Sequence, residues 1–313
     1  MSHDPTLDAE LAAMEATARA ARASIPPLPE ASLRELLPRT FVEAHSGTRA
    51  HRSRSKGGDD YGYDAAEEHR LRRVLKFLYD DYFRVESSGL EHVPSEGRVL
   101  LVGNHAGTLP FDGLMLRQAL AHDTHAPRHV RWLVEDAVFH MPFMGTLVNR
   151  LGAVRACQEN AERLLSEERA VAVFPEGLKG IGKLYRDRYR LQRFGRGGFV
   201  KLALRTRAPV LPVAILGSEE TNPLLFRVEA FARRFGLPYF PVTPTFPLLG
   251  PLGLLPMPAK WRIVVGPPID FSGASAADAN DDLLVAELTE RTRSTIAGML
   301  GDLLRARRSV LRG

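Results

Sequence analysis

Short runs rich in apolar residues recur from residue 83 onward, and longer segments with many charged residues separate them. The runs lie at residues 83–86, 99–102, 131–134, 171–174, 208–215 and 261–265. Runs of about four to eight such residues, bounded by glycine, proline or charge, are typical of strands buried in a sheet. The pattern therefore predicts a strand at each of these positions.

Segments with helical spacing or helical composition lie before, between and after these runs. They occupy residues 65–82, 113–120, 160–168, 197–205 and 283–307. In the first segment Leu71, Leu75 and Leu78 share one face, and arginines and a lysine occupy the others. This helix either covers the core with a solvated basic side or rests on a membrane surface. Strands that alternate with helices predict an α/β fold, with a mostly parallel central sheet flanked by helices.

The first part of the chain has a different character. Residues 7–23 have helical composition, and the prolines that follow end the segment. Residues 46–62 are rich in Arg, Ser, Gly and Asp without a periodic apolar face, which favours a mobile linker. We therefore predict a helical and flexible extension over residues 1–62 and a folded domain over residues 63–313.

A histidine and an aspartate follow the strand predicted at residues 99–102. His105 lies in the loop after this strand, and Asp112 lies at the start of the next helix, where aspartate is a good N-cap. A carboxylate there can turn back toward the imidazole and orient it to remove a proton from a hydroxyl group. Because such pairs also occur in capped loops without chemistry, the interpretation requires a second motif.

A second polar motif follows the strand predicted at residues 171–174. The strand ends abruptly before Glu176 and Gly177, and Lys179 comes directly afterwards. In parallel sheets, ligands bind beyond the carboxyl ends of the strands. We therefore expect Glu176 and His105 at the same edge of the sheet.

Two more blocks complete a recognisable series. One closes at Arg155, after the segment at residues 143–150, and the other is the strand at residues 208–215, which Pro212 interrupts. In this order and at these spacings the four blocks resemble the glycerolipid acyltransferase family, whose best-known members acylate lysophosphatidic acid. The resemblance covers about residues 90–269, and the Asn-His start and the Phe-Pro-Glu-Gly block are its most specific parts.

The resemblance implies residue roles and substrates. His105 is the general base and Asp112 its partner, while Arg155, Glu176, Gly177 and Lys179 bind the acceptor. The acyl donor is acyl-CoA or acyl carrier protein, used as a co-substrate. No metal, no other cofactor and no nucleic acid are expected. No nucleophile on the protein is required, because the acceptor hydroxyl attacks the thioester directly.

The chain departs from the family pattern at two places. Six residues separate His105 from Asp112, whereas the family's first block usually has four. The Pro-Phe-Asp ending of this block is similar to a divergent branch near the diacylglycerol-acylating members. Lys179 stands where the third block usually has an arginine. The favoured acceptor is a lysophosphatidic acid-like molecule, and the alternatives are a neutral acceptor such as diacylglycerol or a non-catalytic lipid-binding protein.

Composition adds expectations about location. The net charge of +5 suits an ordinary basic surface or a protein resting on anionic lipid, and the single cysteine, Cys157, fits a reducing cytoplasm. The first ten residues are acidic and polar, unlike a signal peptide. No window approaches the roughly 20 apolar residues of a membrane-spanning helix. We therefore expect a peripheral protein at the cytoplasmic face of the membrane.

The most apolar window, residues 244–258, contains too many prolines for a regular helix. It is either a loop packed over the sheet or an apolar lip that enters lipid or lines an acyl-chain groove. Its neighbours Lys260 and Trp261 suit an interface.

Two rival interpretations rest on short motifs. Residues 177–183 nearly spell a phosphate-binding loop, but Leu184 stands where Ser or Thr must hold Mg²⁺. The polar stretch from His122 to His129 contains three histidines and an aspartate, whose spacing matches no closed tetrahedral metal set. Cys157 lies in a polar segment apart from the motifs, and we expect it to be non-catalytic.

Overall fold

The structure, a computed structural model, describes residues 58–106, 109–124, 126–139, 144–228 and 239–312. The described residues all belong to one compact unit, residues 51–313. The helix predicted at residues 7–23 lies outside the described residues, and the domain boundary at residue 62 stays a prediction.

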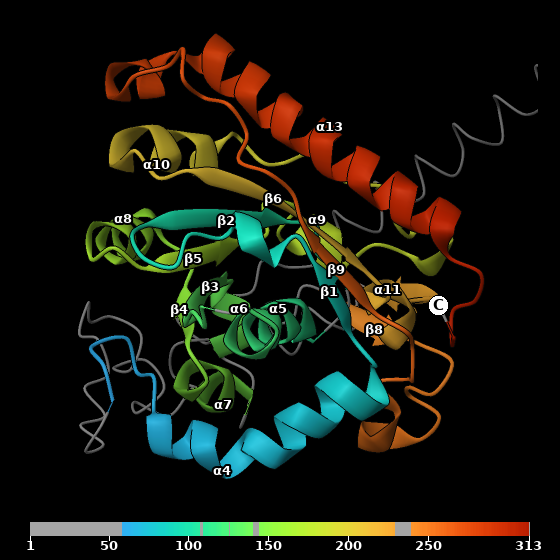
Figure 1. Ribbon diagram of the computed structural model, residues 1–313. Helices are drawn as coiled ribbons and strands as arrows, with labels where there is room; N and C mark the ends of the chain where they lie inside the picture. Colours follow the sequence, from blue (N-terminus) through green and yellow to red (C-terminus); the bar gives the residue numbers. More distant parts are fainter. Residues whose placement is uncertain (1–57, 107–108, 125, 140–143, 229–238, 313) are drawn as a thin grey trace, which may run out of the picture. The chain divides into compact units, whose positions relative to one another are not determined.

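The centre of this unit is a seven-stranded sheet with the order β1-β9-β6-β2-β5-β3-β4 (Figure 1). Its strands are β1 (Glu86–Ser88), β2 (Val99–Gly103), β3 (Val130–Val134), β4 (Ala153–Arg155), β5 (Ala170–Val173), β6 (Val210–Leu216) and β9 (Arg262–Val265). Neighbouring strands are parallel except for the β6–β9 pair. The prediction of a mostly parallel sheet is confirmed. A separate antiparallel pair joins β7 (Phe226–Val228) to β8 (Phe240–Val242).

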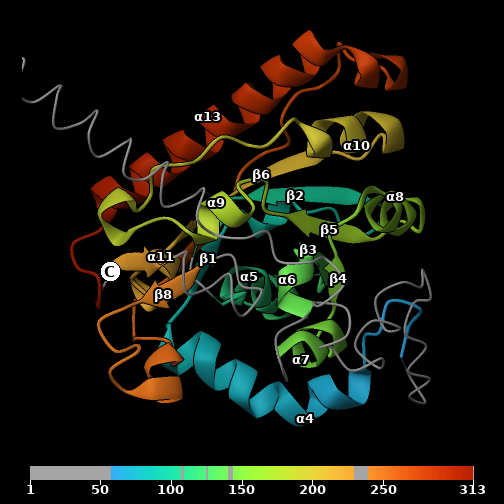
Figure 2. The same ribbon diagram turned by 180° about the vertical axis from the view of Figure 1, so that it is seen from behind.

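Helices cover both faces of the sheet, as Figures 1 and 2 show. The α-helices are α4 (Ala65–Lys76), α5 (Phe111–His122), α6 (Asp136–Phe139), α7 (Met144–Arg150), α8 (Gln158–Ser166), α9 (Leu178–Ile181), α10 (Gly198–Thr206), α11 (Ser218–Thr221) and α13 (Asp282–Ala306). A π-helix, η1 (Phe77–Tyr82), continues α4, and 3-10 turns lie at η2 (Leu90–His92), η3 (Tyr185–Asp187), η5 (Gly250–Leu254) and η6 (Ala276–Asn280). Helices α8, α10 and α13 lie over one face, and α4, α5 and α7 lie over the other.

Strand β2 lies in the middle of the sheet, and all five of its residues are buried. Leu100 and Val102 pack into the core beneath α8, α10 and α13, whereas Val99 and Leu101 pack against the core beneath α4 and α5. Alternate side chains of a strand point to opposite faces, so a strand covered on both sides must be apolar throughout. This requirement explains why the sequence shows uninterrupted apolar runs.

Two expectations were wrong, one about where a strand begins and one about Trp261. The strand predicted from residue 83 begins at Glu86, because the Phe83 N–H still bonds to the Leu78 carbonyl and Arg84 has a φ of 46°. The fully buried Phe83 ring stacks on Trp261 at 5.0 Å between centroids. Trp261 is therefore a core residue and does not lie at an interface.

The mobile-linker interpretation is wrong for residues 58–62, the part of that segment that the structure describes. The Asn149 amide donates to the Tyr61 carbonyl at 2.8 Å, and Arg131 forms an ion pair with Asp59. These contacts fix residues 58–62 against the sheet and α7.

A buried asparagine joins β2 to β6 just past the end of β2. Asn104 has no exposed surface, and its Oδ1 accepts from the Ile215 N–H at 2.7 Å. Its Nδ2 donates to the Ile215 carbonyl at 2.9 Å. The side chain thus extends the hydrogen bonding between β2 and β6 and fixes the loop that begins with His105.

None of the helices among the described residues combines the length and the apolar character needed to cross a membrane. The proline-rich window at residues 244–258 contains only the short turn η5 and no α-helix, as its prolines predict.

We expect Asn104→Ala to lower the free energy of unfolding by about 2–4 kcal/mol, because it leaves the buried N–H and carbonyl of Ile215 without partners. Urea unfolding followed by circular dichroism measures the change. Asn160→Ala, which removes an exposed bond to the Arg155 carbonyl, should change stability by less than about 0.5 kcal/mol. Equal effects of the two substitutions would contradict the role given to Asn104.

Candidate active site

His105 and Asp112 touch at the carboxyl end of β2. The His105 Nδ1 donates to Asp112 Oδ2 across 2.9 Å, and the carboxylate is fully buried while the imidazole side chain is 17% exposed. The longer spacer therefore still brings the two groups together. Asp112 does not cap α5, because Pro110 holds the N-cap position and Asp112 is the second helical residue.

The Asp112 carboxylate also orders the loop that carries the histidine. Its Oδ2 accepts a second hydrogen bond, from the Ala106 N–H at 2.8 Å. The Phe174 ring stacks on the imidazole with 5.0 Å between centroids. With Nδ1 directed at the carboxylate, Nε2 is the ring nitrogen available to accept a proton.

Glu176 fixes the same loop from β5. Its Oε1 accepts from the His105 backbone N–H at 2.9 Å, and its Oε2 accepts from the Gln192 backbone N–H at 2.7 Å. The residue is 3% exposed. Glu176 and His105 do lie at one edge of the sheet, as expected. Both carboxylate oxygens of Glu176 accept hydrogen bonds from backbone N–H groups.

A buried ion cluster lies behind Glu176. The Lys183 ammonium lies 3.2 Å from Glu176 and 3.0 Å from Glu219, and its side chain is 3% exposed. Burial raises the pKa of Glu219 to about 7, although Lys183 opposes the shift. Burial lowers the pKa of Lys183, but the two carboxylates outweigh it and raise the pKa overall. Lys183 is thus a buried counter-ion for two carboxylates. It therefore does not serve as the lysine of a phosphate-binding loop.

Two glycines allow the loops to approach this closely. A Cβ on Gly180 would lie 2.7 Å from the Cβ of Glu176 and 3.0 Å from the His105 carbonyl oxygen. Gly177 has a φ of 54°, which L side chains rarely adopt, and its N–H donates to the Phe174 carbonyl at 3.0 Å. Gly177 therefore shapes the turn, and its N–H is already engaged.

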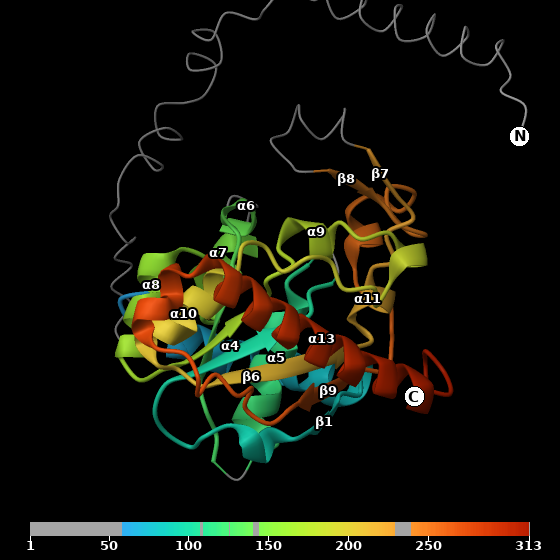
Figure 3. The same ribbon diagram turned by 90° about the horizontal axis from the view of Figure 1, so that it is seen from above.

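A cavity of about 320 Å³ opens beside His105. Its walls combine the ends of β3 and β5 with the N-terminal parts of α8 and α10, and most of them are apolar. Lining residues include Leu133, Val173, Phe194, Phe199, Leu202 and Ala161. Figure 3 shows α6 and α9, which follow β3 and β5, above this end of the sheet. An apolar cavity that meets a histidine can hold a hydrocarbon chain with its reactive end at the imidazole.

Cys157 lies closer to the site than its sequence position indicated. It is half-buried, and it lines the same cavity as His105. The expectation that it lies apart from the motifs was wrong, because α8 begins beside the ends of β3 and β5. Its expected lack of a catalytic role stays a prediction.

The two predicted cationic ligands lie at the edge of this region. Arg155 forms a bidentate ion pair with Asp136, at 2.5 and 2.6 Å, and both side chains are at least half exposed. Lys179 is exposed on the short helix α9. Neither lines the cavity of His105, whereas Gly177 does.

Sequence reasoning missed the residues that support the site from behind. The sequence motif offers Lys183 as a phosphate ligand or as a solvated surface lysine, and it assigns no role to Glu219. A signal for Glu219 does exist, because it lies three residues past the carboxyl end of β6. Asn104 was noted as part of a motif, but its bonds to Ile215 depend on strand order, which the sequence does not reveal.

Comparison with known proteins supplies the family. Residues 84–216 match the family described as Acyltransferase. An uncharacterized protein of Mycobacterium leprae is 52% identical over 257 residues, which span 82% of this chain and 70% of that protein. A chicken protein, described as a DGAT1/2-independent enzyme synthesizing storage lipids, is 23% identical over 81% of this chain and 73% of its own length.

Two further matches are more distant. A 1-acyl-sn-glycerol-3-phosphate acyltransferase of Borreliella burgdorferi is 25% identical over 46% of this chain and 56% of its own length. The crystal structure of the 1-acyl-sn-glycerophosphate acyltransferase PlsC of Thermotoga maritima aligns with a TM-score of 0.49 and 18% identity, over 78% of this chain and 80% of that one. The chain is a member of the glycerolipid acyltransferase family, as the resemblance of its four sequence blocks predicted.

Proposed function

We propose that the protein transfers a fatty acyl group from a thioester, acyl-CoA or acyl carrier protein, to the hydroxyl group of a glycerolipid. The His105 Nε2 takes the hydroxyl proton, and the oxygen attacks the thioester carbonyl carbon. The carbon–sulfur bond then breaks, and the histidine returns the proton to the departing thiolate. The observation that carries this proposal is the 2.9 Å contact between His105 and the buried Asp112 at the mouth of an apolar cavity.

Three groups with separate tasks support this mechanism. Asp112 orients the imidazole and stabilises its protonated form, as carboxylates do in catalytic triads. Glu176, with Lys183 and Glu219 behind it, holds the His105 backbone in place. The cavity takes the acyl chain, since Leu133, Phe199 and Leu202 offer a hydrocarbon surface.

The favoured acceptor is a lysophosphatidic acid-like molecule, with Arg155 and Lys179 as ligands for its phosphate. The planar fork of arginine suits a phosphate group, and both cations lie on elements that flank the site. In this assignment Asp136 releases Arg155, which is feasible because an exposed ion pair contributes at most about 1 kcal/mol.

A neutral acceptor such as diacylglycerol is the second candidate. It is favoured by the engagement of Arg155 with Asp136 and of Lys183 with two carboxylates. The chicken relative, which matches most of the chain, is described as an enzyme synthesizing storage lipids. Such an acceptor needs no cationic ligand.

We also propose a peripheral position at the cytoplasmic face of the membrane, attached through an apolar lip. Four of the five leucines in the window at residues 244–258 are exposed: Leu248 84%, Leu249 55%, Leu252 69% and Leu255 62%. This exposure favours the lip over a loop packed on the sheet, because large apolar side chains gathered at a surface mark an interaction site.

The junction of α4 and η1 continues this apolar surface. Val74 and Phe77 are each about half exposed, at 53% and 52%. The Phe77 ring contacts Tyr82, whose hydroxyl donates to the Pro256 carbonyl. Figure 1 shows the end of α4 beside the η5 segment. Basic residues of α4 near Val74, such as Arg73 and Lys76, are exposed and suit anionic headgroups.

His105→Ala should lower kcat by at least about 100-fold, because general base catalysis contributes that much or more. Thioester hydrolysis and acyl transfer are measured with a thiol reagent, using acyl-CoA and a panel of lysolipids and diacylglycerol. His69→Ala, at an exposed histidine on α4, is the control and should retain activity. If the wild-type protein binds these lipids but releases no thiol from acyl-CoA, it is a lipid-binding protein and not an enzyme.

The double variant Arg155→Ala with Lys179→Ala decides between the acceptors. For a phosphorylated acceptor we expect KM to rise by about tenfold or more, since a hydrogen bond to a charged group contributes about 1.5–3 kcal/mol. The rate with diacylglycerol should be unchanged. If the rate with lysophosphatidic acid is also unchanged, the role assigned to these two cations is refuted.

The wild-type protein should float with anionic vesicles at low salt. Leu248→Ser with Leu252→Ser should reduce vesicle binding by about 100-fold, because burying one leucine contributes about 1.5–3 kcal/mol. Leu283→Ser, at a leucine that is 85% exposed on α13, is the matched control and should float like the wild type. Equal flotation of all three proteins would exclude the lip as the attachment site.

A further inference from the structure

A second cavity, of about 280 Å³, lies at the opposite edge of the sheet from His105. It is lined by Gly58, Asp59, Tyr63, Arg117, His129, Val130, Arg131 and Arg169. Val130 begins β3, and Arg169 directly precedes β5, so the cavity lies at the amino ends of these strands. The mechanism proposed above makes no use of this region.

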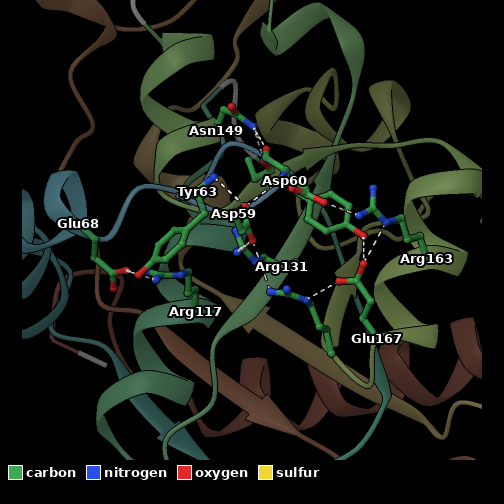
Figure 4. Close-up of polar contacts among 12 residues, drawn as sticks. Asp59, Asp60, Tyr63, Glu68, Arg117, Arg131, Asn149, Arg163 and Glu167 are labelled. Carbon is green, nitrogen blue, oxygen red and sulfur yellow. Dashed lines mark hydrogen bonds and ion pairs between the residues drawn. The ribbon is translucent and has the colours of Figure 1, made fainter. Parts of the chain in front are cut away.

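Three arginines meet at this cavity, and two of them are almost completely buried. Arg117 is 1% exposed and Arg131 is 5% exposed, while Arg169 is partly exposed. The Tyr63 ring lies beneath both buried guanidinium groups, 5.7 Å from that of Arg117 and 4.6 Å from that of Arg131. Figure 4 shows Tyr63 among these arginines with its hydroxyl directed at Glu68. Burying a charged group is costly unless hydrogen bonds satisfy it.

The carboxylates nearby satisfy these arginines only in part. Asp59 pairs with Arg131 and lies 3.4 Å from Arg169, and Glu68 pairs with Arg117. Within the described part of the chain, the Nη1 atoms of Arg117 and Arg131 are buried without a hydrogen-bond partner.

A third carboxylate in the region, that of Glu167, serves other groups as well. Glu167 lies 3.0 Å from Arg169, but it also lies 3.0 Å from Arg163 and accepts from the Tyr61 hydroxyl. Asp60 pairs with Arg163 from the outside. The cavity therefore has three guanidinium groups at its wall and one lining carboxylate, with Glu68 behind Arg117.

We propose that this cavity binds an oxyanion of the phosphate type, either a free phosphate or phosphomonoester or the phosphate of a lipid headgroup. A tetrahedral oxyanion has acceptors in several directions, and guanidinium groups are well suited to bind it. It would pair the orphaned donors of Arg117 and Arg131, with Arg169 completing the contact from the partly exposed side. His129, exposed at the cavity, is a further donor in reach of a bound anion.

Calorimetric titration of the full chain with inorganic phosphate and with glycerol 3-phosphate, at constant ionic strength adjusted with chloride, tests this inference. Vesicles that contain phosphatidic acid form a separate arm and identify a lipid headgroup as the source. We expect saturable one-site binding of at least one of these probes. Arg169→Gln should weaken it by about tenfold or more, whereas Arg163→Gln, which removes a neighbouring guanidinium outside the cavity, should leave it unchanged.

Two more variants separate a ligand site from a purely structural cluster. Glu68→Gln removes a negative charge behind Arg117 and should tighten anion binding several-fold, although it weakens an ion pair within the protein. Binding that Lys179→Ala abolishes and Arg169→Gln leaves intact would instead place the anion at the acceptor site, at the other edge of the sheet, and would overturn the proposal. Absence of saturable binding of all three probes overturns the proposal, as does binding that Arg169→Gln leaves intact.

Discussion

The hydrogen bond between Glu176 and the backbone of His105 is the constraint on which the candidate site depends. It joins the loop after β2 to the turn after β5, although the two residues are far apart in sequence. A buried carboxylate is unfavourable unless its oxygens are bonded, and here each oxygen holds a backbone N–H while Lys183 supplies a counter-charge. Because the loop is fixed in this way, the imidazole meets Asp112 despite a spacer of six residues.

Much of this arrangement could be predicted from the sequence because it follows from local rules. Strands β2, β5 and β6 are buried on both faces, so their apolar runs were unambiguous. The parallel direction of β2 and β5 then places His105 and Glu176 at one edge of the sheet. Contact between His105 and Asp112 followed from a strand, a loop and the start of a helix, even though Pro110 rather than Asp112 occupies the N-cap.

The features that sequence reasoning missed depend on contacts between distant segments. The pairing of Asp59 with Arg131 fixes a stretch whose composition resembles a flexible linker. Glu219 reaches the candidate site only because β6 lies beside β2. Cys157 lines the cavity because α8 begins where β3 and β5 end. Local composition carries no information about such contacts, since each is decided by strand order and not by the segment itself.

Buried charges at the two edges of the sheet are compensated to different extents. At the carboxyl edge Glu176, Glu219 and Lys183 are buried together, so that negative charge is compensated within the protein. At the amino edge Arg117 and Arg131 are buried, and within the described residues the Nη1 atom of each has no hydrogen-bond partner. Helix α5 spans both regions, since it carries Asp112 in its first turn and Arg117 further along. One helix therefore positions both the carboxylate that contacts His105 and a guanidinium group of the arginine cavity.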